Sequence, residues 1–205
     1  MRLNHATKQI QIKLVYCGAA RSGKTANLEY LHGHADQAAG DTLESIKDSQ
    51  DRTLLFDFAP FDLPKVNGYD VHCQIFTLPG NMRMETPGDL AFSGLDGLVL
   101  VVDSGWEQLE SNLQYLEDLQ ASLFAHGLRL ASLPHVLQYN KRDLENPIPL
   151  PHLNYLFNRE GASAFEACAI DGEGVFEALN GLARLVLNRV LVEHFNAIPE
   201  ELKVW

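Results

Sequence analysis

An octet of small and polar residues at positions 18–25 carries the pattern G-x-x-x-x-G-K-[ST], directly after an apolar run. Its members are Gly18, Ala19, Ala20, Arg21, Ser22, Gly23, Lys24 and Thr25. Glycines in such an octet let the backbone curl, so that successive N–H groups and the first turn of a following helix point at a phosphate. Lys24 would add a positive charge toward the β- and γ-phosphates of a nucleotide, and the Thr25 hydroxyl could ligate Mg²⁺. The octet predicts a site for nucleotide phosphates and Mg²⁺, with an ordinary strand-to-helix turn as the alternative.

A second polar group, at positions 140–143, follows another apolar run and has the pattern N-K-x-D. Held in the plane of a base, the Asp143 carboxylate could accept two parallel hydrogen bonds from N1–H and the 2-amino group of guanine, which adenine does not offer in that arrangement. Asn140 would tie this loop to the phosphate loop, and the Lys141 stem would lie on the face of the base. Alone, the pattern could equally be a turn capped by Asn and Asp. Downstream of a phosphate loop and at the end of a strand, it predicts a guanine site.

Short β-rich runs alternate with longer amphipathic stretches along the chain, which predicts strands separated by helices. The six predicted strands are 9–17, 53–61, 69–77, 97–103, 134–140 and 163–169. Leucines recur at three- and four-residue steps through 107–124, which predicts one face of a helix, and a closing helix is expected from 175 to about 195. These strands and helices are the elements that must carry the two polar groups.

Asn67-Gly68 lies between the second and third predicted strands and is a strong hairpin signal, so those two strands should be antiparallel neighbours. The other strands are separated by helices and should be parallel. We therefore expect an α/β fold with a mostly parallel sheet of about six strands, one of them antiparallel, and helices on both faces. All of 1–205 should form a single domain, with a short tail at about 196–205.

The composition excludes several classes of protein. The formal charge is −11, from 27 acidic and 16 basic residues without a basic block, so nucleic acid and anionic membranes are poor partners. No segment approaches the roughly 20 apolar residues of a membrane span, and neither end carries a lipidation motif. Three widely separated cysteines, Cys17, Cys73 and Cys168, suggest buried reduced thiols, which suits the cytoplasm.

With these motifs the chain resembles the Ras-like small GTPases, and more closely the bacterial gliding-motility GTPases of the MglA family. The resemblance runs from 12 to about 190. It rests on GAARSGKT at 18–25, DRTLLFDF at 51–58, TLPG at 77–80, LVLVVDS at 98–104, QYNKRDL at 138–144 and EACAIDGEGVFEAL at 166–179. It implies a P-loop NTPase fold of the small G-protein type, a GTP/GDP switch and Mg²⁺. It also implies protein partners that include Roadblock/LC7-domain (MglB-like) proteins, which act on the nucleotide cycle.

The resemblance also assigns residues outside the first two motifs. Thr53 resembles the first-switch threonine that senses Mg²⁺ and the γ-phosphate, although Thr42 is a second candidate in the polar segment before it. Ala169 would place its backbone amide beneath guanine O6, flanked by Cys168 and Ile170. Both assignments are inherited from the family pattern.

The residues that would support hydrolysis are less regular. Gly80 resembles the second-switch glycine whose amide binds the γ-phosphate, and Arg52 resembles the family's own arginine, which reaches the phosphates in cis. A solvated loop cation is the alternative for Arg52. Arg21 and Arg83 are weaker candidates for the same charge.

Three positions depart from the common Ras-like pattern. Thr77 replaces an aspartate, as it does in MglA-like proteins, and Ala20 replaces a glycine near the γ-phosphate. Asn81 replaces the glutamine that follows the second-switch glycine and is one methylene shorter. Because a displacement of about 1 Å can cost on the order of a hundredfold in rate, we expect nucleotide binding more firmly than turnover.

Three interpretations remain open at this point. The leading one is a Mg²⁺-dependent GTP/GDP-binding switch with slow hydrolysis, acting through partner proteins in cell polarity, motility or a related intracellular process. The first alternative is a guanine-nucleotide-binding interaction module that is deficient in hydrolysis. The second is a P-loop ATPase or phosphotransferase that uses Asp103, at the end of an apolar strand, as its metal acid.

Overall fold

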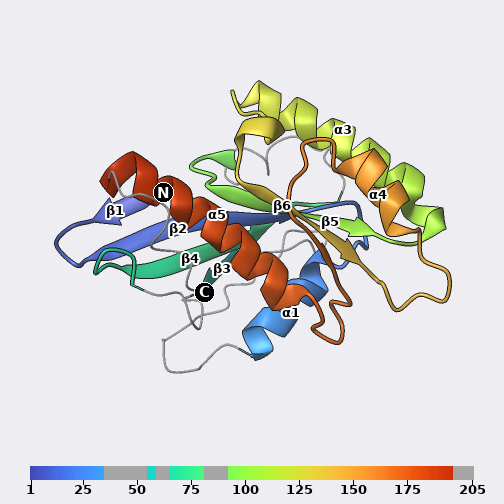
Figure 1. The fold of residues 1–205 in the computed structure, drawn as a ribbon, viewed down its shortest axis with the longest axis horizontal. Helices are drawn as coiled ribbons and strands as arrows, with labels where there is room; N and C mark the ends of the chain where they lie inside the picture. Colours follow the sequence, from blue (N-terminus) through green and yellow to red (C-terminus); the bar gives the residue numbers. More distant parts are fainter. Residues whose placement is uncertain (35–54, 59–64, 81–91, 196–205) are drawn as a thin grey trace.

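The computed structural model describes residues 1–34, 55–58, 65–80 and 92–195 (Figure 1). Its strands are β1 (Arg2–Asn4), β2 (Gln9–Cys17), β3 (Leu55–Phe58), β4 (Asp70–Thr77), β5 (Gly97–Asp103), β6 (His135–Asn140) and β7 (Ala164–Glu166). Its α-helices are α1 (Lys24–Gly33), α3 (Leu109–Ala125), α4 (Leu150–Phe157) and α5 (Val175–Phe195), with short 3₁₀ helices η2 (Trp106–Gln108) and η3 (Leu130–Ser132). All six predicted strands and both predicted helices are present.

The strands form one sheet in the order β3-β4-β2-β5-β6-β7, in which every neighbouring pair except β3 and β4 is parallel. The predicted antiparallel pair is therefore confirmed. At Asn67-Gly68 both φ angles are positive, and Val66 and Tyr69 exchange two backbone hydrogen bonds of 2.9 Å, as a tight hairpin turn requires. The added strand β1, which was not predicted, pairs antiparallel with the start of β2.

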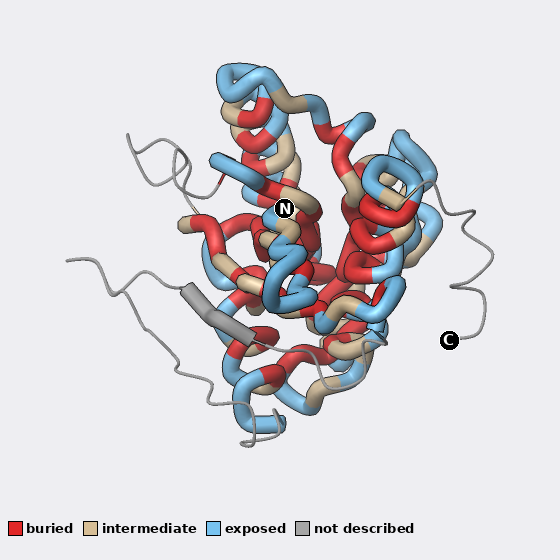
Figure 2. The backbone as a smooth tube through the Cα atoms, turned by 90° about the vertical axis from the view of Figure 1, so that its left-hand side faces the viewer, coloured by how far each residue is buried: buried red, intermediate tan, exposed pale blue. Residues whose placement is uncertain are grey.

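Helices cover both faces of the sheet (Figure 1). Helices α1 and α5 pack on one face through Leu28, Leu31 and a buried stripe of α5, and α3 and α4 pack on the other through Leu119, Leu123 and Leu153. Figure 2 shows buried backbone through the centre of the molecule. All seven residues of β5 are buried, because this strand has helices above and below it.

The buried face of α3 differs from the leucine stripe that the sequence suggests. Leu119 and Leu123 are buried, but the other fully buried positions are Asn112 and Tyr115, while the remaining leucines of the stripe are only partly buried. The helix is thus rotated so that two polar side chains face the sheet. Both side chains lie in the N-terminal part of α3, which is the end of the helix near the predicted site.

The predicted strand 163–169 is too long, because β7 ends at Glu166. Ala167 still donates its N–H to the Tyr139 carbonyl, but the chain then leaves the sheet and Cys168 pairs with Glu173 across a small loop. All three cysteines are buried and free of disulfide bonds, as predicted. None of the helices that the structure describes is long and apolar enough to cross a membrane.

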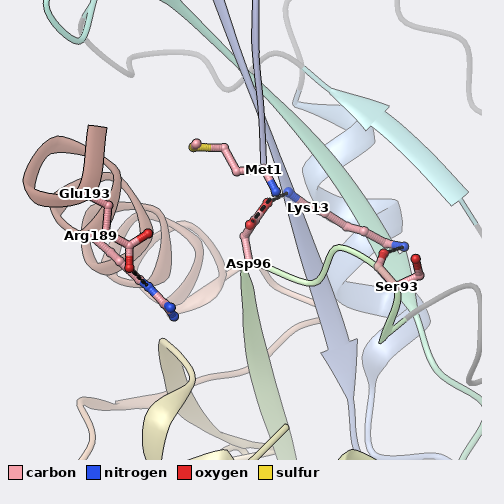
Figure 3. A network of polar contacts seen from close by, with 6 residues as sticks. All are labelled: Met1, Lys13, Ser93, Asp96, Arg189 and Glu193. Carbon is pink, nitrogen blue, oxygen red and sulfur yellow. Dashed lines mark hydrogen bonds and ion pairs between the residues drawn. The ribbon is translucent and has the colours of Figure 1, made fainter. Parts of the chain in front are cut away.

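A polar network fixes the opposite end of the sheet, where β5 begins (Figure 3). The Asp96 carboxylate accepts hydrogen bonds from the Met1 amino group at 2.6 Å and from the Lys13 backbone N–H at 2.8 Å. The Lys13 ammonium donates to the Ser93 carbonyl at 2.9 Å. These contacts join β2 to β5 far along the strands from the predicted site.

Candidate nucleotide-binding site

The predicted site residues that the structure describes gather at one edge of the sheet. Strands β2, β5, β6 and β7 are successive neighbours in the sheet and run parallel to one another. Their carboxyl ends, and the loops that follow them, therefore meet at this edge. Open α/β sheets bind ligands at this edge. The phosphate loop follows β2, the N-K-x-D loop follows β6, and the 168–170 loop follows β7.

The phosphate loop is shaped by backbone conformations that side chains rarely adopt. Gly18, Arg21 and Gly23 all have positive φ, at 152°, 63° and 102°. A Cβ on Gly18 would collide with the Val101 carbonyl, and a Cβ on Gly23 would collide with the Asn140 amide. Both glycines are therefore required by close packing as well as by φ. Gly23 directly precedes α1, so the loop ends at a helix N-terminus.

Lys24 is a buried cation at the centre of this loop. Only 9 % of it is exposed, and its ammonium donates to the Gly18 and Ala19 carbonyls at 2.7 Å each. No carboxylate of the described residues forms an ion pair with it. Desolvation lowers the pKa of Lys24 to about 8, and the electrostatic effect of Cys17 opposes this shift. A desolvated ammonium beside a helix N-terminus is an arrangement that an anion stabilises.

Asn140 connects the phosphate loop to the two loops on the base side. Its side-chain NH₂ donates to the Ser22 carbonyl at 2.8 Å, and its side-chain oxygen accepts the Ala169 N–H at 2.9 Å. The residue is buried, so both bonds are made away from water. One side chain therefore sets the spacing of three loops.

Hydrogen bonds and ion pairs to neighbouring segments hold the N-K-x-D loop in place. Arg142 donates to the Ile148 carbonyl at 2.8 Å and pairs with Glu166 at 3.2 Å, and its own N–H donates to the Ala167 carbonyl. The Lys141 ammonium lies 2.6 Å from a carboxylate oxygen of Asp103, at the end of β5. This ion pair gives Asp103 a role other than that of a metal acid.

The base-reading candidate Asp143 is exposed and lies beside the 168–170 loop. Desolvation, with hydrogen bonds to Asp171 and Asp143, raises the pKa of the Cys168 thiol to about 12. Cys168 is therefore a protonated side chain next to the Asp143 carboxylate rather than a reactive thiolate. Ala169 is buried, whereas Ile170 is 73 % exposed at the mouth of the site.

Gly80, which is predicted to begin the second switch, lies against the phosphate loop. A Cβ on Gly80 would collide with the backbone of Ala20 and lie 2.8 Å from the Ala19 carbonyl carbon. Gly80 follows β4, in which Thr77 is buried. Glycine is needed here for close approach of two backbones.

The described residues offer few protein ligands for a metal. None of their His, Cys, Asp and Glu side chains form a group of three that could hold an ion. Thr25 is exposed in the first turn of α1, and no other described residue is hydrogen-bonded to its hydroxyl. Mg²⁺ commonly keeps several waters and binds through phosphates and few protein groups, so these residues fit a metal that arrives with a nucleotide.

Several predicted site residues lie outside the described part of the chain. They are Thr42, Arg52, Thr53, Asn81 and Arg83. The described residues thus include the predicted phosphate and base positions and Gly80, but not Arg52, Thr53 and Asn81, the other residues assigned to hydrolysis.

Two further residues of α3, which no motif indicates, lie near Lys24 and the end of β5. The ring centre of Tyr115 is 6.0 Å from the Lys24 ammonium, and Asn112 donates to the Asp103 carbonyl at 2.9 Å. Burial raises the pKa of Tyr115 well above its usual value. The sequence signal that could have identified them is their spacing, because Asn112 and Tyr115 are two polar residues three positions apart on the face of α3 that packs against the sheet.

Comparison with known proteins identifies the family. No family profile matches the chain. The chain is 35 % identical over 188 residues to the mutual gliding-motility protein MglA of Myxococcus xanthus (strain DK1622), covering 92 % of this chain and 96 % of that protein. The chain therefore belongs to the MglA family of Ras-like small GTPases.

Proposed function

We propose that this protein is a Mg²⁺-dependent GTP/GDP switch with slow intrinsic hydrolysis, working in the cytoplasm through partner proteins in cell polarity, motility or related regulation. Its partners would include Roadblock/LC7-domain proteins of the MglB type. Membership of the MglA family supports a GTPase-type switch. The Mg²⁺ dependence, the rate and the partners are the parts of this proposal that need experiments.

The observation that carries the proposal is the environment of Lys24. Its ammonium is desolvated, is held by two carbonyls and meets no carboxylate among the described residues. The positive end of α1 and the curled backbone at Gly18 and Gly23 converge on the same place. These features together favour the β-phosphate of a nucleotide, because phosphate would replace the lost hydration of the cation.

The base side of the proposal rests on Asn140. By bonding to Ser22 and Ala169, it holds the base loops at a fixed distance from the phosphate loop. The Ala169 N–H is directed at Asn140, and Asp143 is exposed beside it. A purine nucleotide that reaches from Lys24 would place its base between these loops, where Asp143 selects guanine.

Bound Mg²⁺ would supply charge neutralisation at the β- and γ-phosphates. Thr25 and, in the first switch, Thr53 would be its protein ligands. Gly80 would direct its amide at the γ-phosphate, Arg52 would add positive charge, and Asn81 would orient water. Because Ala20 adds a methyl group and Asn81 is one methylene short, intrinsic hydrolysis should be slow.

Two measurements test the proposal. Chromatography of the nucleotide released from purified protein should give GDP or GTP. Single-turnover decay of bound GTP, followed with and without a Roadblock/LC7-domain protein and with EDTA as a metal-free control, should be slow alone and faster with the partner. Bound GTP that does not decay in either arm would instead support the alternative of a hydrolysis-deficient interaction module.

Asp143→Asn should lower the affinity for GDP by about a hundredfold, because the amide NH₂ repels the N1–H and 2-amino donors that the carboxylate accepts. The measurement is competition of GDP, XDP and ADP against a fluorescent guanine nucleotide. Xanthine carries an oxygen at position 2, so XDP should lose less affinity than GDP or gain some. Unchanged GDP affinity would contradict the base assignment and favour a P-loop ATPase or phosphotransferase.

Gly80→Ala should weaken GTP binding about tenfold relative to GDP, because its methyl group would push the Gly80 amide away from the phosphate loop. The measurement is the ratio of affinities for a non-hydrolysable GTP analogue and for GDP. Gly33→Ala is the matched control, since a Cβ on Gly33 meets nothing within 4 Å. An equal loss for both nucleotides would argue against contact with the γ-phosphate.

A further inference from the structure

Asp103 and Lys141 form an ion pair at the junction of β5 and β6. The register of these parallel strands places Asp103 opposite Asn140, so Lys141 follows one residue beyond the strand. One carboxylate oxygen lies 2.6 Å from the Lys141 ammonium, and the other accepts the Gly105 N–H at 2.9 Å. The Asp103 side chain is 2 % exposed and that of Lys141 is 36 % exposed.

Neighbouring elements also hold the backbone at Asp103 in place. Its backbone carbonyl accepts a hydrogen bond from Asn112 of α3, and the Ser104 N–H after it donates to the Asn140 carbonyl. A buried carboxylate needs a charged partner, and Lys141 is its only ion-pair partner among the described residues. The fixed member of the pair is therefore Asp103, and the movable member is Lys141.

The backbone of Lys141 points to the same conclusion. Its φ is +62°, a left-handed conformation that a lysine seldom adopts without a local requirement. This conformation turns the side chain from the end of β6 toward the end of β5, where Asp103 receives the ammonium. The four methylene groups therefore extend from the loop after β6 to the carboxylate at the end of β5.

We propose that Asp103 is a positioning residue for nucleotide binding: it anchors the Lys141 ammonium so that the methylene stem forms one wall of the guanine pocket. This rests on the proposed function of the same site. The role uses both oxygens of the carboxylate, one for the Lys141 ammonium and one for the Gly105 N–H. Asp103 acts through Lys141 and reads no atom of the base.

Asp103→Asn distinguishes the positioning of Lys141 from a purely structural role of Asp103, in which its side chain only accepts the Gly105 N–H after the end of β5. An asparagine oxygen can still accept the Gly105 N–H, but the neutral amide no longer holds the ammonium, which can turn toward solvent. Dissociation of mant-GDP should become about tenfold faster, as for other truncated charge pairs at binding sites. The ratio of GDP to IDP affinity should stay unchanged, since IDP lacks only the 2-amino group that Asp143 would read.

A double-mutant cycle with Lys141→Met gives the decisive measurement. Methionine keeps an apolar stem but leaves Asp103 without a counter-charge, so this variant should also release mant-GDP about tenfold faster. The double variant Asp103→Asn/Lys141→Met contains no unpaired charge and should release it no faster than either single variant. Comparison of Lys141→Met with the double variant still tests the pair if Asp103→Asn alone fails to fold.

Glu166→Gln is the matched control, because it removes the exposed Arg142–Glu166 ion pair from the same loop. Its mant-GDP dissociation rate should stay within about twofold of wild type. An unchanged mant-GDP dissociation rate for Asp103→Asn would overturn the positioning role. It would also be overturned if the rate increases of the two single variants multiplied in the double variant, because the two residues would then act independently. Failure of wild-type protein to bind mant-GDP would contradict the proposed function itself and the positioning role with it.

Discussion

Lys24→Met is expected to reduce GDP and GTP affinity by roughly a hundredfold to a thousandfold, while the nucleotide-free protein stays folded. The variant removes the ammonium that would meet the phosphates but keeps most of the stem. In the nucleotide-free protein it removes a desolvated charge whose pKa shift from 10.5 to about 8 corresponds to about 3 kcal/mol. It also leaves the Gly18 and Ala19 carbonyls without their donor, at about 1–3 kcal/mol each. These opposing effects should leave the free energy of unfolding changed far less than the nucleotide affinity.

Lys13→Met is the matched control for that variant. Lys13 is also a partly buried lysine with a lowered pKa, caused by desolvation, and it donates to the Ser93 carbonyl at the opposite end of the sheet (Figure 3). Isothermal titration of GDP and thermal unfolding should show normal affinity for Lys13→Met. Retained affinity in Lys24→Met would show that the phosphates bind elsewhere.

The pKa of Lys24 also gives the affinity a pH dependence. In the nucleotide-free protein the pKa is lowered to about 8, and bound phosphate would raise it again by stabilising the ammonium. Affinity should therefore be fully present below pH 8 and should fall as the pH rises through that value, by roughly tenfold between pH 7 and 9. Proton uptake on binding, measured by calorimetry at pH 8.2 in two buffers of different ionisation enthalpy, should be present in wild type and absent in Lys24→Met. Equal heats in both buffers for wild type would rule out this linkage.

The fold could be predicted because parallel strands buried on both faces leave a clear signal in the sequence. The run at 98–102 is continuously apolar, and β5 is buried at all of its residues. Strand β1 could not be predicted, because an alternation over only three residues is too short to distinguish a strand from a loop. The end of β7 was missed for a different reason: the apolar residues Ala167 and Ala169 are buried in a loop rather than in the sheet.

The geometry of the candidate site could be predicted where one short segment supplies all of its parts. The octet specifies Gly18, Gly23 and Lys24 together, and their positive φ angles and buried cation follow from local spacing. The pairing of Asp103 with Lys141 could not be predicted, because it depends on the register of β5 against β6. The position of Tyr115 beneath Lys24 depends on the rotation of α3, which a leucine repeat does not determine.

Asn140→Asp should lower the affinity for GDP by at least roughly a hundredfold and the free energy of unfolding by about 2–4 kcal/mol. The carboxylate could still accept the Ala169 N–H, but it cannot donate to the Ser22 carbonyl and would repel it. The new charge would also be buried between the loops that are proposed to hold the phosphates and the base. The phosphate loop and the base loops would then lose their common support, so both ends of the nucleotide would bind more weakly. Chemical unfolding and GDP titration of the same preparation measure the two losses.

Asn158→Asp provides a control with the same chemistry at a distant place. Asn158 also donates to and accepts from the backbone, through two bonds to Ala162 of 2.8 and 2.7 Å after the end of α4. It is only partly buried, so its replacement should cost about 1 kcal/mol of stability and leave GDP affinity within about twofold. If both variants lost stability but neither lost GDP affinity, the hydrogen bond from Asn140 to Ser22 would stabilise the fold without contributing to nucleotide binding. A loss of affinity confined to Asn140→Asp would instead establish that the spacing of the three loops sets how tightly the nucleotide is held.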